Sequence, residues 1–120
     1  SFKITQAVAN LGQLGALVTA LHRSDLELFG RSISDALVEP LRAPLVPGFS
    51  AVKQVALEAG ALGCSLSGSG PSVFAFARSD DQAQDLADRM ATRFRDAAGL
   101  ESDSYVGKVN MRGARRVTEE

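Results

Sequence analysis

Apolar residues recur every three or four positions near the start of the chain, at Ile4, Val8, Leu11, Leu14, Leu17 or Val18, and Leu21. This spacing places them on one face of a helix, so the pattern predicts an amphipathic helix over residues 4–21. The serine, aspartate, leucine and glutamate at 24–27 have the order of a capping box, which predicts that a second helix begins there. Its apolar side chains would be Leu28, Phe29, Ile33 and Leu37.

Three prolines within residues 39–48 (EPLRAPLVPG) break this helical pattern. Proline lacks an amide donor and restrains the residue before it, so the segment predicts a rigid loop or a distorted helix end. A third helix is expected from about Ser50, with Gly60 as its C-terminal cap. Its buried face would consist of Val52, Val55, Ala56 and Ala59.

The pattern changes again after Gly60. Two short stretches, 64–67 and 73–76, flank a glycine-rich turn and predict two strands. Ser79 and Gln82 have the spacing of another capping box, at the start of a helix that should end near Gly99. Residues 105–110 and 114–117 are expected to close the fold as a hairpin that turns near Gly113.

This order of elements predicts an α+β fold. Helices on one face of a mainly antiparallel sheet of about four strands would bury both sets of apolar residues. A length of 120 residues suits one domain with one core. Because the chain begins at Ser1 rather than Met, directly at a predicted helix, we expect it to be part of a longer protein.

Composition argues against several classes of function. The formal net charge of −1 argues against a nucleic-acid partner, which requires a basic excess on one face. No unbroken apolar run approaches the roughly 18 residues of a membrane span, and no signal-peptide pattern is visible. The single cysteine, Cys64, excludes an internal disulfide and favours a reducing, cytoplasmic location.

The clearest chemistry lies in the turn at 65–72 (SLSGSGPS). Its glycines let a ligand approach the backbone closely, and successive amides can form a concave anion site. Two common phosphate motifs are absent, because Ser69 stands where a P-loop requires lysine and Val73 stands where a dinucleotide fingerprint requires glycine. The turn therefore suits a phosphate group, while a purely structural connection between two strands stays an alternative.

Residues 63–72 (GCSLSGSGPS), followed by an apolar strand, resemble the third conserved motif of the GHMP kinases. Residues 39–49 (EPLRAPLVPGF) are similar to the segment that precedes this motif in the homoserine kinase branch of that family. The resemblance implies that residues 1–120 form the C-terminal, ferredoxin-like domain of a two-domain enzyme. The family's own phosphate loop, Pro-x-x-x-Gly-Leu-Gly-Ser-Ser-Ala, belongs to the N-terminal half and does not occur here.

The resemblance also implies a reaction. The parent enzyme would transfer the γ-phosphoryl group of ATP to the hydroxyl of L-homoserine in threonine biosynthesis, with Mg²⁺ held by the N-terminal half. Arg42 matches the family's substrate-binding arginine, and its planar guanidinium suits an α-carboxylate. The residues beside the nucleotide phosphates would be Ser67, Gly68, Ser69 and Gly70. From the residues alone, pairing with Glu39 or exposure to solvent is the alternative for Arg42.

The remaining candidates carry less chemistry. His22 is expected at a helix end rather than as a catalytic base, and Cys64 in the core rather than as a nucleophile. Arg89 and Arg93 are expected on a solvated helix face, and contact of one of them with the substrate in the whole enzyme is the alternative. The chain shows no catalytic residue and no metal-ligand spacing of its own, so activity should require the N-terminal half. An exposed apolar surface is expected where that half docks, or where two copies form a homodimer.

Two other functions stay open on the sequence. One is another GHMP kinase that acts on a sugar or an isoprenoid precursor. The other is a non-catalytic α+β module for ligand binding or dimerisation.

Overall fold

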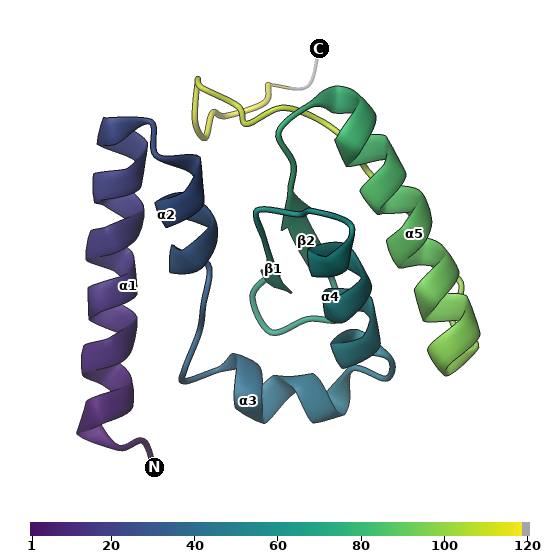
Figure 1. Cartoon of the computed structure of the whole chain (residues 1–120), viewed down its shortest axis with the longest axis horizontal. Coiled ribbons are helices and arrows are strands. Elements are labelled where there is room, and N and C mark those ends of the chain that lie inside the picture. The colour runs from purple at the N-terminus through teal and green to yellow at the C-terminus, as the bar shows by residue number, and fades with distance from the viewer. Residues whose placement is uncertain (119–120) are drawn as a thin grey trace.

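The computed structural model describes residues 1–118 and has the expected α+β architecture, but its sheet has two strands rather than about four (Figure 1). The elements are α1 (Ile4–Arg23), α2 (Leu26–Ser32), α3 (Glu39–Arg42), the 3₁₀ turn η1 (Ala43–Leu45), α4 (Phe49–Glu58), β1 (Gly63–Leu66), β2 (Val73–Phe76) and α5 (Asp80–Ala98). The helices of the first sixty residues therefore follow the predicted order, with α3 and η1 added.

The boundary between α1 and α2 differs from the predicted capping box. Ser24 is the C-cap of α1, in a left-handed conformation (φ 53°), and the N-cap of α2 is Asp25. The Asp25 carboxylate accepts a hydrogen bond from the Leu28 amide at 2.9 Å. Because α2 ends at Ser32, the expected helical positions Ile33 and Leu37 lie outside it.

The proline-rich segment forms two short helical turns. Pro40 and Pro44 occupy the first turns of α3 and η1, where a missing amide donor costs nothing. Asp35 stands before α3 and accepts hydrogen bonds from the amides of Leu37, Val38 and Glu39 at 2.8, 2.9 and 3.0 Å. Of the two predicted alternatives, a rigid loop or a distorted helix end, the structure is nearer to the second, although the helical turns form separate short elements.

The sheet is an antiparallel hairpin. β1 pairs with β2 in a register that sets Gly63 opposite Phe76 and Leu66 opposite Val73, close to the predicted strands. The following helix begins at the predicted Ser79, whose hydroxyl accepts from the Gln82 amide at 3.1 Å. The Gln82 side-chain oxygen accepts a hydrogen bond from the Arg78 amide at 2.7 Å, whereas a capping box would use the amide of Ser79, the next residue.

The core lies between the hairpin and the helix pair α4 and α5. Two buried clusters fill it, Val46 with Phe49 and Leu66, and Ala56 with Cys64 and Leu86. The sequence analysis expected all helices on one face of the sheet, and this expectation is wrong. α2 covers the other face, because the Phe29 ring meets the Phe76 ring edge-on at 4.9 Å.

The C-terminal segment does not form the predicted closing hairpin. Within residues 101–118 the chain has no strand, although a turn is present near Gly113, which has φ 67°. Strands are stable only when paired. Residues 101–109 run along α5 and form no backbone hydrogen bond within the part of the chain that the structure describes.

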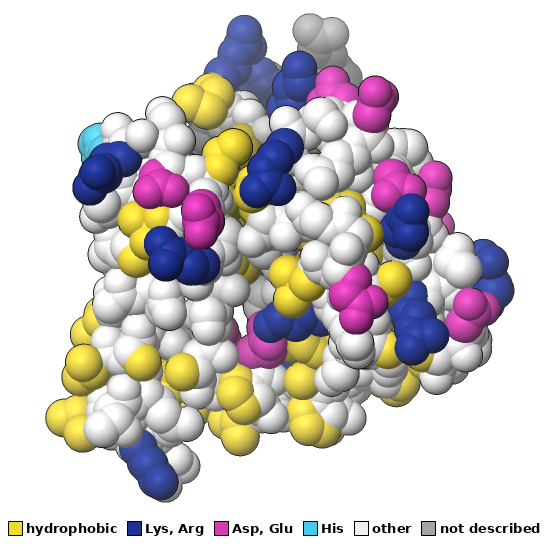
Figure 2. Space-filling model, in the orientation of Figure 1, with side chains coloured by type: hydrophobic (Ala, Val, Ile, Leu, Met, Phe, Trp, Pro, Cys, Tyr) yellow, Lys and Arg dark blue, Asp and Glu magenta, His cyan; other side chains and the backbone are white. Residues whose placement is uncertain are grey.

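The apolar face of α1 is exposed to solvent. It consists of Ile4, Val8, Leu11, Leu14, Val18 and Leu21, whose exposed fractions lie between 47% and 79%. Figure 2 shows apolar side chains gathered over the lower part of this helix and continuing toward α3. By length and composition alone, α1 could cross a membrane. The sequence analysis did not predict this, because polar residues interrupt the apolar ones along the helix.

Candidate functional site

The glycine-rich loop joins β1 to β2 and is closed by its own backbone. The Ser67 amide donates to the Ser72 carbonyl at 2.8 Å, and the Gly70 amide donates to the Ser67 carbonyl at 3.1 Å. Gly68 and Gly70 have φ of 60° and 78°, conformations that favour glycine. The structure thus places the predicted residues Ser67, Gly68, Ser69 and Gly70 together in one tight, largely exposed loop.

The proline-rich segment packs directly beside this loop. Arg42 donates from its Nε to the Ser69 carbonyl oxygen at 3.0 Å. A Cβ added at Gly70 would lie 3.1 Å from Cγ2 of Val46. A larger residue at Gly70 would therefore crowd the Val46 side chain and would also be strained by the positive φ of 78°. Two features that are 27 residues apart in sequence form one site.

Arg42 is not paired with Glu39. The Glu39 carboxylate contacts Lys53 Nζ through one oxygen and accepts from the Ser65 hydroxyl (2.5 Å) through the other. Among residues 1–118, no acidic side chain forms an ion pair with Arg42. Since only its Nε is engaged by the loop, the end of the guanidinium is available to an anion.

The Glu39, Lys53 and Ser65 network was not predicted. It joins α3, α4 and β1 and is mostly shielded, since the side chains of Glu39 and Lys53 are 15% and 26% exposed. Lys53 also lies over the Phe49 ring, 5.9 Å from its centroid. Glu39 and Ser65 are 26 residues apart, and no sequence motif links them. Only the fold shows that these contacts attach the helix carrying Arg42 to α4 and β1.

The free donors of the loop are few and well defined. The amides of Gly68 and Ser69 donate to no backbone acceptor within the described residues, whereas those of Ser67 and Gly70 are engaged. Ser67, Ser69 and Ser72, which carry hydroxyls, are exposed in the same loop. Two adjacent free amides with hydroxyl neighbours suit a phosphate oxygen.

Cys64 is part of the core, as predicted. It is 1% exposed and packs with Ala56 and Leu86. Burial raises the pKa of the Cys64 thiol to about 11, with a smaller opposing effect from Lys53. The thiolate that a nucleophile requires is therefore disfavoured at this position.

The other residues that were set aside lie on the surface. His22 is in the last turn of α1, and Arg93 is exposed on α5. Arg89 pairs with Asp85 at 2.8 Å, one helical turn away, as a solvated helix face predicts. None of the three contacts the glycine-rich loop in the hydrogen bonds or ion pairs of the structure.

Comparison with known families accounts for this arrangement. A family model described as the GHMP kinases C terminal matches residues 17–96, which include the proline-rich segment and the glycine-rich loop. The chain belongs to the GHMP kinases. It forms the C-terminal domain of that family, as the resemblance of the two motifs implied.

Several relatives of this GHMP kinase domain are homoserine kinases. The homoserine kinase of Chloroherpeton thalassium is 49% identical over 112 residues, which are 93% of this chain and 35% of the relative. That of Chlorobaculum tepidum is 45% identical over 98% of this chain and 37% of its own length. That of Arabidopsis thaliana is 43% identical over 92% of this chain and 30% of its own length.

A solved structure shares the fold. The homoserine kinase from Cytophaga hutchinsonii superposes with a TM-score of 0.86 and is 50% identical, over 92% of this chain and 35% of that chain. This GHMP kinase domain therefore spans about a third of the length of the relatives that it matches. The predicted family and its C-terminal position are confirmed.

Proposed function

We propose that this chain is the C-terminal part of an enzyme that transfers the γ-phosphoryl group of ATP to the side-chain hydroxyl of L-homoserine. One observation carries the proposal. Arg42 is held against the glycine-rich loop by its bond to the Ser69 carbonyl, and its remaining donors face no acid within residues 1–118. This contact supports a site in which Arg42 would bind an anionic group of the substrate and the adjacent turn would bind phosphate.

Arg42 would bind the α-carboxylate of homoserine. A guanidinium offers a planar fork of donors that matches a carboxylate in two parallel hydrogen bonds. Its Nε is already fixed by Ser69, so the group is oriented before substrate arrives. The contacts of Glu39 with Lys53 and Ser65 fix the first turn of α3, the helix that carries Arg42.

The loop would contribute to seating the phosphates of ATP. The free amides of Gly68 and Ser69 are the available backbone donors, because the Gly70 amide is engaged by Ser67. Phosphoryl transfer depends mainly on positioning and on stabilisation of charge. This chain would therefore position both the substrate and the nucleotide, and it would supply no proton-transfer group.

Mg²⁺ fits poorly to this chain alone. Residues 1–118 hold no group of three His, Cys, Asp or Glu side chains close enough to bind a metal ion. Glu39 lies on the same short helix as Arg42, but its two carboxylate oxygens already contact Lys53 and Ser65. We therefore assign the ligands of Mg²⁺ to the rest of the enzyme.

The exposed face of α1 would dock the N-terminal domain of that enzyme. A neighbouring side of α1 already contacts its own domain, because Asn10 donates to Asp35 and accepts from the Ala36 amide, both at 2.8 Å. A helix with one polar side bound to its own domain is poorly suited to crossing a bilayer, where such groups are costly. We favour a protein partner, with self-association of the isolated chain as the consequence of its absence.

Steady-state kinetics of the complete enzyme tests the role of Arg42. Arg42→Ala should raise the KM for L-homoserine about 30-fold or more, because truncating one partner of a buried charge pair costs about 2 kcal/mol or more. Arg42→Lys should recover only part of this loss, since an ammonium cannot form the two-bond contact. The KM for ATP should change less than about threefold in either variant.

Arg89→Ala serves as the control, because this exposed arginine contacts only Asp85 on the same helix. It should leave both KM values unchanged. An unaltered homoserine KM in both Arg42 variants would remove the substrate role. If the complete wild-type enzyme phosphorylates mevalonate or galactose but not L-homoserine, the proposed reaction is wrong while the family assignment stands.

A further inference from the structure

Glu39 and Arg42 carry opposite charges and lie three residues apart on the same short helix, α3. At this spacing, with the acid on the N-terminal side, the two side chains of a helix are neighbours and can pair. Both also point toward the same hairpin, because Glu39 accepts from Ser65 of β1 and Arg42 donates to the Ser69 carbonyl in the loop. Within residues 1–118 they nevertheless form no ion pair with each other. Other groups must therefore hold the Glu39 carboxylate.

These groups are Lys53 of α4 and Ser65 of β1. Lys53 Nζ contacts one carboxylate oxygen of Glu39, and the Ser65 hydroxyl donates to the other at 2.5 Å, so both oxygens are occupied. Lys53 is itself held by the core, since its Nζ lies 5.9 Å from the ring centroid of Phe49, which is 2% exposed. Lys53 neutralises Glu39, whereas the uncharged hydroxyl of Ser65 only sets the direction of its carboxylate.

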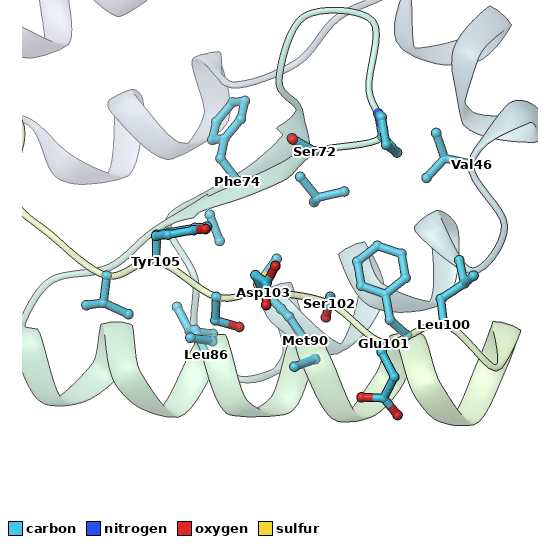
Figure 3. Close-up of a pocket in the computed structure, with 18 of the residues that line it drawn as sticks. Val46, Ser72, Phe74, Leu86, Met90, Leu100, Glu101, Ser102, Asp103 and Tyr105 are labelled. Atoms are coloured by element: carbon cyan, nitrogen blue, oxygen red, sulfur yellow. The ribbon is translucent and has the colours of Figure 1, made fainter.

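The other acids near the loop do not share the space around Arg42. A hollow of about 750 Å³ borders the loop at Ser72 and extends along α5. Figure 3 shows the two acids that line it, Glu101 and Asp103, on the C-terminal segment beside α5. Arg42 does not line this hollow. Glu39 is therefore the acid that competes most directly for Arg42.

Loss of the lysine charge would release this competition. The Glu39 side chain is only 15% exposed, so its charge would stand without a counter-charge in a mostly shielded position. Such a charge is costly, and the cation that α3 offers one turn away is Arg42. A Glu39 carboxylate paired with Arg42 would occupy the same donors that a substrate carboxylate requires.

We propose that Lys53 is a positioning residue, which holds Glu39 away from Arg42 and so keeps the guanidinium free for an anionic substrate. Lys53 acts through Glu39 and contacts no substrate. The inference deepens the proposed function, because it rests on Arg42 as the anchor of the α-carboxylate of L-homoserine. Pairing of Arg42 with Glu39, the alternative that the sequence left open, is then the state that Lys53 prevents.

Steady-state kinetics of the complete enzyme tests the inference. Lys53→Met removes the charge but keeps an unbranched side chain over Phe49. It should raise the KM for L-homoserine about fivefold or more, because the substrate must displace Glu39 from Arg42. The KM for ATP, and kcat at saturating L-homoserine, should change less than about threefold, since Lys53 takes no part in the chemical step.

The double variant Glu39→Gln with Lys53→Met separates positioning from a purely structural role. A glutamine keeps an oxygen that can accept from the Ser65 hydroxyl, but it has no charge to attract Arg42. The KM for L-homoserine should therefore return to within about threefold of the wild-type value. A network that only stabilised the fold would be weakened further by the second substitution, and the KM would not recover.

Two single variants are the controls. Lys53→Arg conserves the charge and should keep the KM for L-homoserine within about twofold of the wild-type value. Lys108→Met removes one positive charge far from α3 in sequence, from a side chain that is 84% exposed and lies 3.9 Å from Asp80. It should leave both KM values unchanged, so that a general effect of lost positive charge is excluded.

A crystal structure of the complete Lys53→Met enzyme without substrate gives a readout besides activity. The Glu39 carboxylate should lie within about 4 Å of the Arg42 guanidinium, the distance of an ion pair. This contact should be absent in Lys53→Arg. It should also be absent in the double variant, where the amide of residue 39 carries no charge.

Three outcomes would overturn the inference. An unchanged KM for L-homoserine in Lys53→Met, where Arg42→Ala raises it, would mean that Glu39 does not compete for Arg42. A raised KM that the double variant does not restore would mean that Lys53 acts through another contact. A Glu39 carboxylate that stays on Ser65 in the Lys53→Met crystal structure would exclude the exchange of partners.

These results separate from those on the proposed reaction. If Arg42→Ala leaves the KM for L-homoserine unchanged, the substrate role of Arg42 is lost. The crystal structure of Lys53→Met then decides alone whether Lys53 keeps Glu39 from Arg42. A complete enzyme that phosphorylates L-homoserine through Arg42, but shows no recovery in the double variant, retains the proposed function and loses this role of Lys53.

Discussion

The two long helices of this domain, α1 and α5, use their apolar faces in opposite ways. α5 carries many charges, yet its apolar side packs on α4 and β2, and Leu86 is 2% exposed. α1 has no charged residue between Ile4 and Leu21, yet Leu11 is 68% exposed. Amphipathic spacing therefore predicts that a helix forms, but the surface that covers its apolar face depends on where the rest of the chain lies.

The largest expected effect comes from breaking the covered helix. Leu86→Ala should destabilise the isolated chain by about 2–5 kcal/mol, because it removes a buried side chain and leaves a cavity between α4 and the hairpin. Urea unfolding followed by circular dichroism measures this change. A loss below about 1 kcal/mol would mean that the α4 and α5 core is loosely packed in solution.

A matched leucine on α1 should behave differently in the two contexts. Leu11→Ala should change the stability of the isolated chain by less than about 0.5 kcal/mol, since the side chain is already in water. In the complete enzyme the same substitution should cost about 2 kcal/mol or more, because the face would be buried by the N-terminal domain.

The difference between the two contexts is the decisive quantity for α1. Equal, small effects in both would leave the exposed face without a partner in the complete enzyme. Leu11→Lys extends the comparison, since a charge on this face should reduce self-association of the isolated chain, measured by light scattering. Unchanged association would place the contact between copies elsewhere.

The same dependence on context explains which predictions succeeded. The long helices, the hairpin and the C-cap at Gly99 followed from local spacing and glycine positions, because each is decided within a few residues. The C-cap of α4 is Ala59, one residue before the predicted Gly60. The boundary at Ser24 was misassigned because Asp25, the next residue, is an equally good N-cap. Local signals therefore identify an element more reliably than its terminal residue.

The C-terminal hairpin failed for a different reason. Its residues have strand-like composition, but a strand needs a partner for its backbone, and none lies beside residues 101–109 in the described chain. The support beneath Arg42 was missed because Glu39 and Ser65 are distant in sequence. Motif resemblance identified Arg42 and the loop, whereas only the fold shows how they are held together.

The smallest expected effect concerns Asp35, which links α1 to the site. Burial alone would raise the pKa of Asp35, but hydrogen bonds from Asn10 and from the amides of Val38, Leu37 and Glu39 outweigh it and lower the pKa below 3.8. Asp35→Asn should therefore cost about 1–2 kcal/mol at pH 7, because the amide is uncharged and has one acceptor oxygen where both carboxylate oxygens of Asp35 accept hydrogen bonds.

The lowered pKa also predicts how the stability difference between the wild-type chain and Asp35→Asn changes with pH. A carboxylate whose pKa is lowered by folding stabilises the native state fully above about pH 4, its unfolded value, and loses that contribution as the pH falls through the folded value. Urea unfolding between pH 7 and pH 2.5 should therefore show the wild-type chain and Asp35→Asn converging at the acidic end. Asp88→Asn, on the exposed side of α5, controls for the general loss of one negative charge. A constant gap down to pH 2.5 would mean that Asp35 holds α1 and α3 together by shape and neutral hydrogen bonds, rather than by its charge.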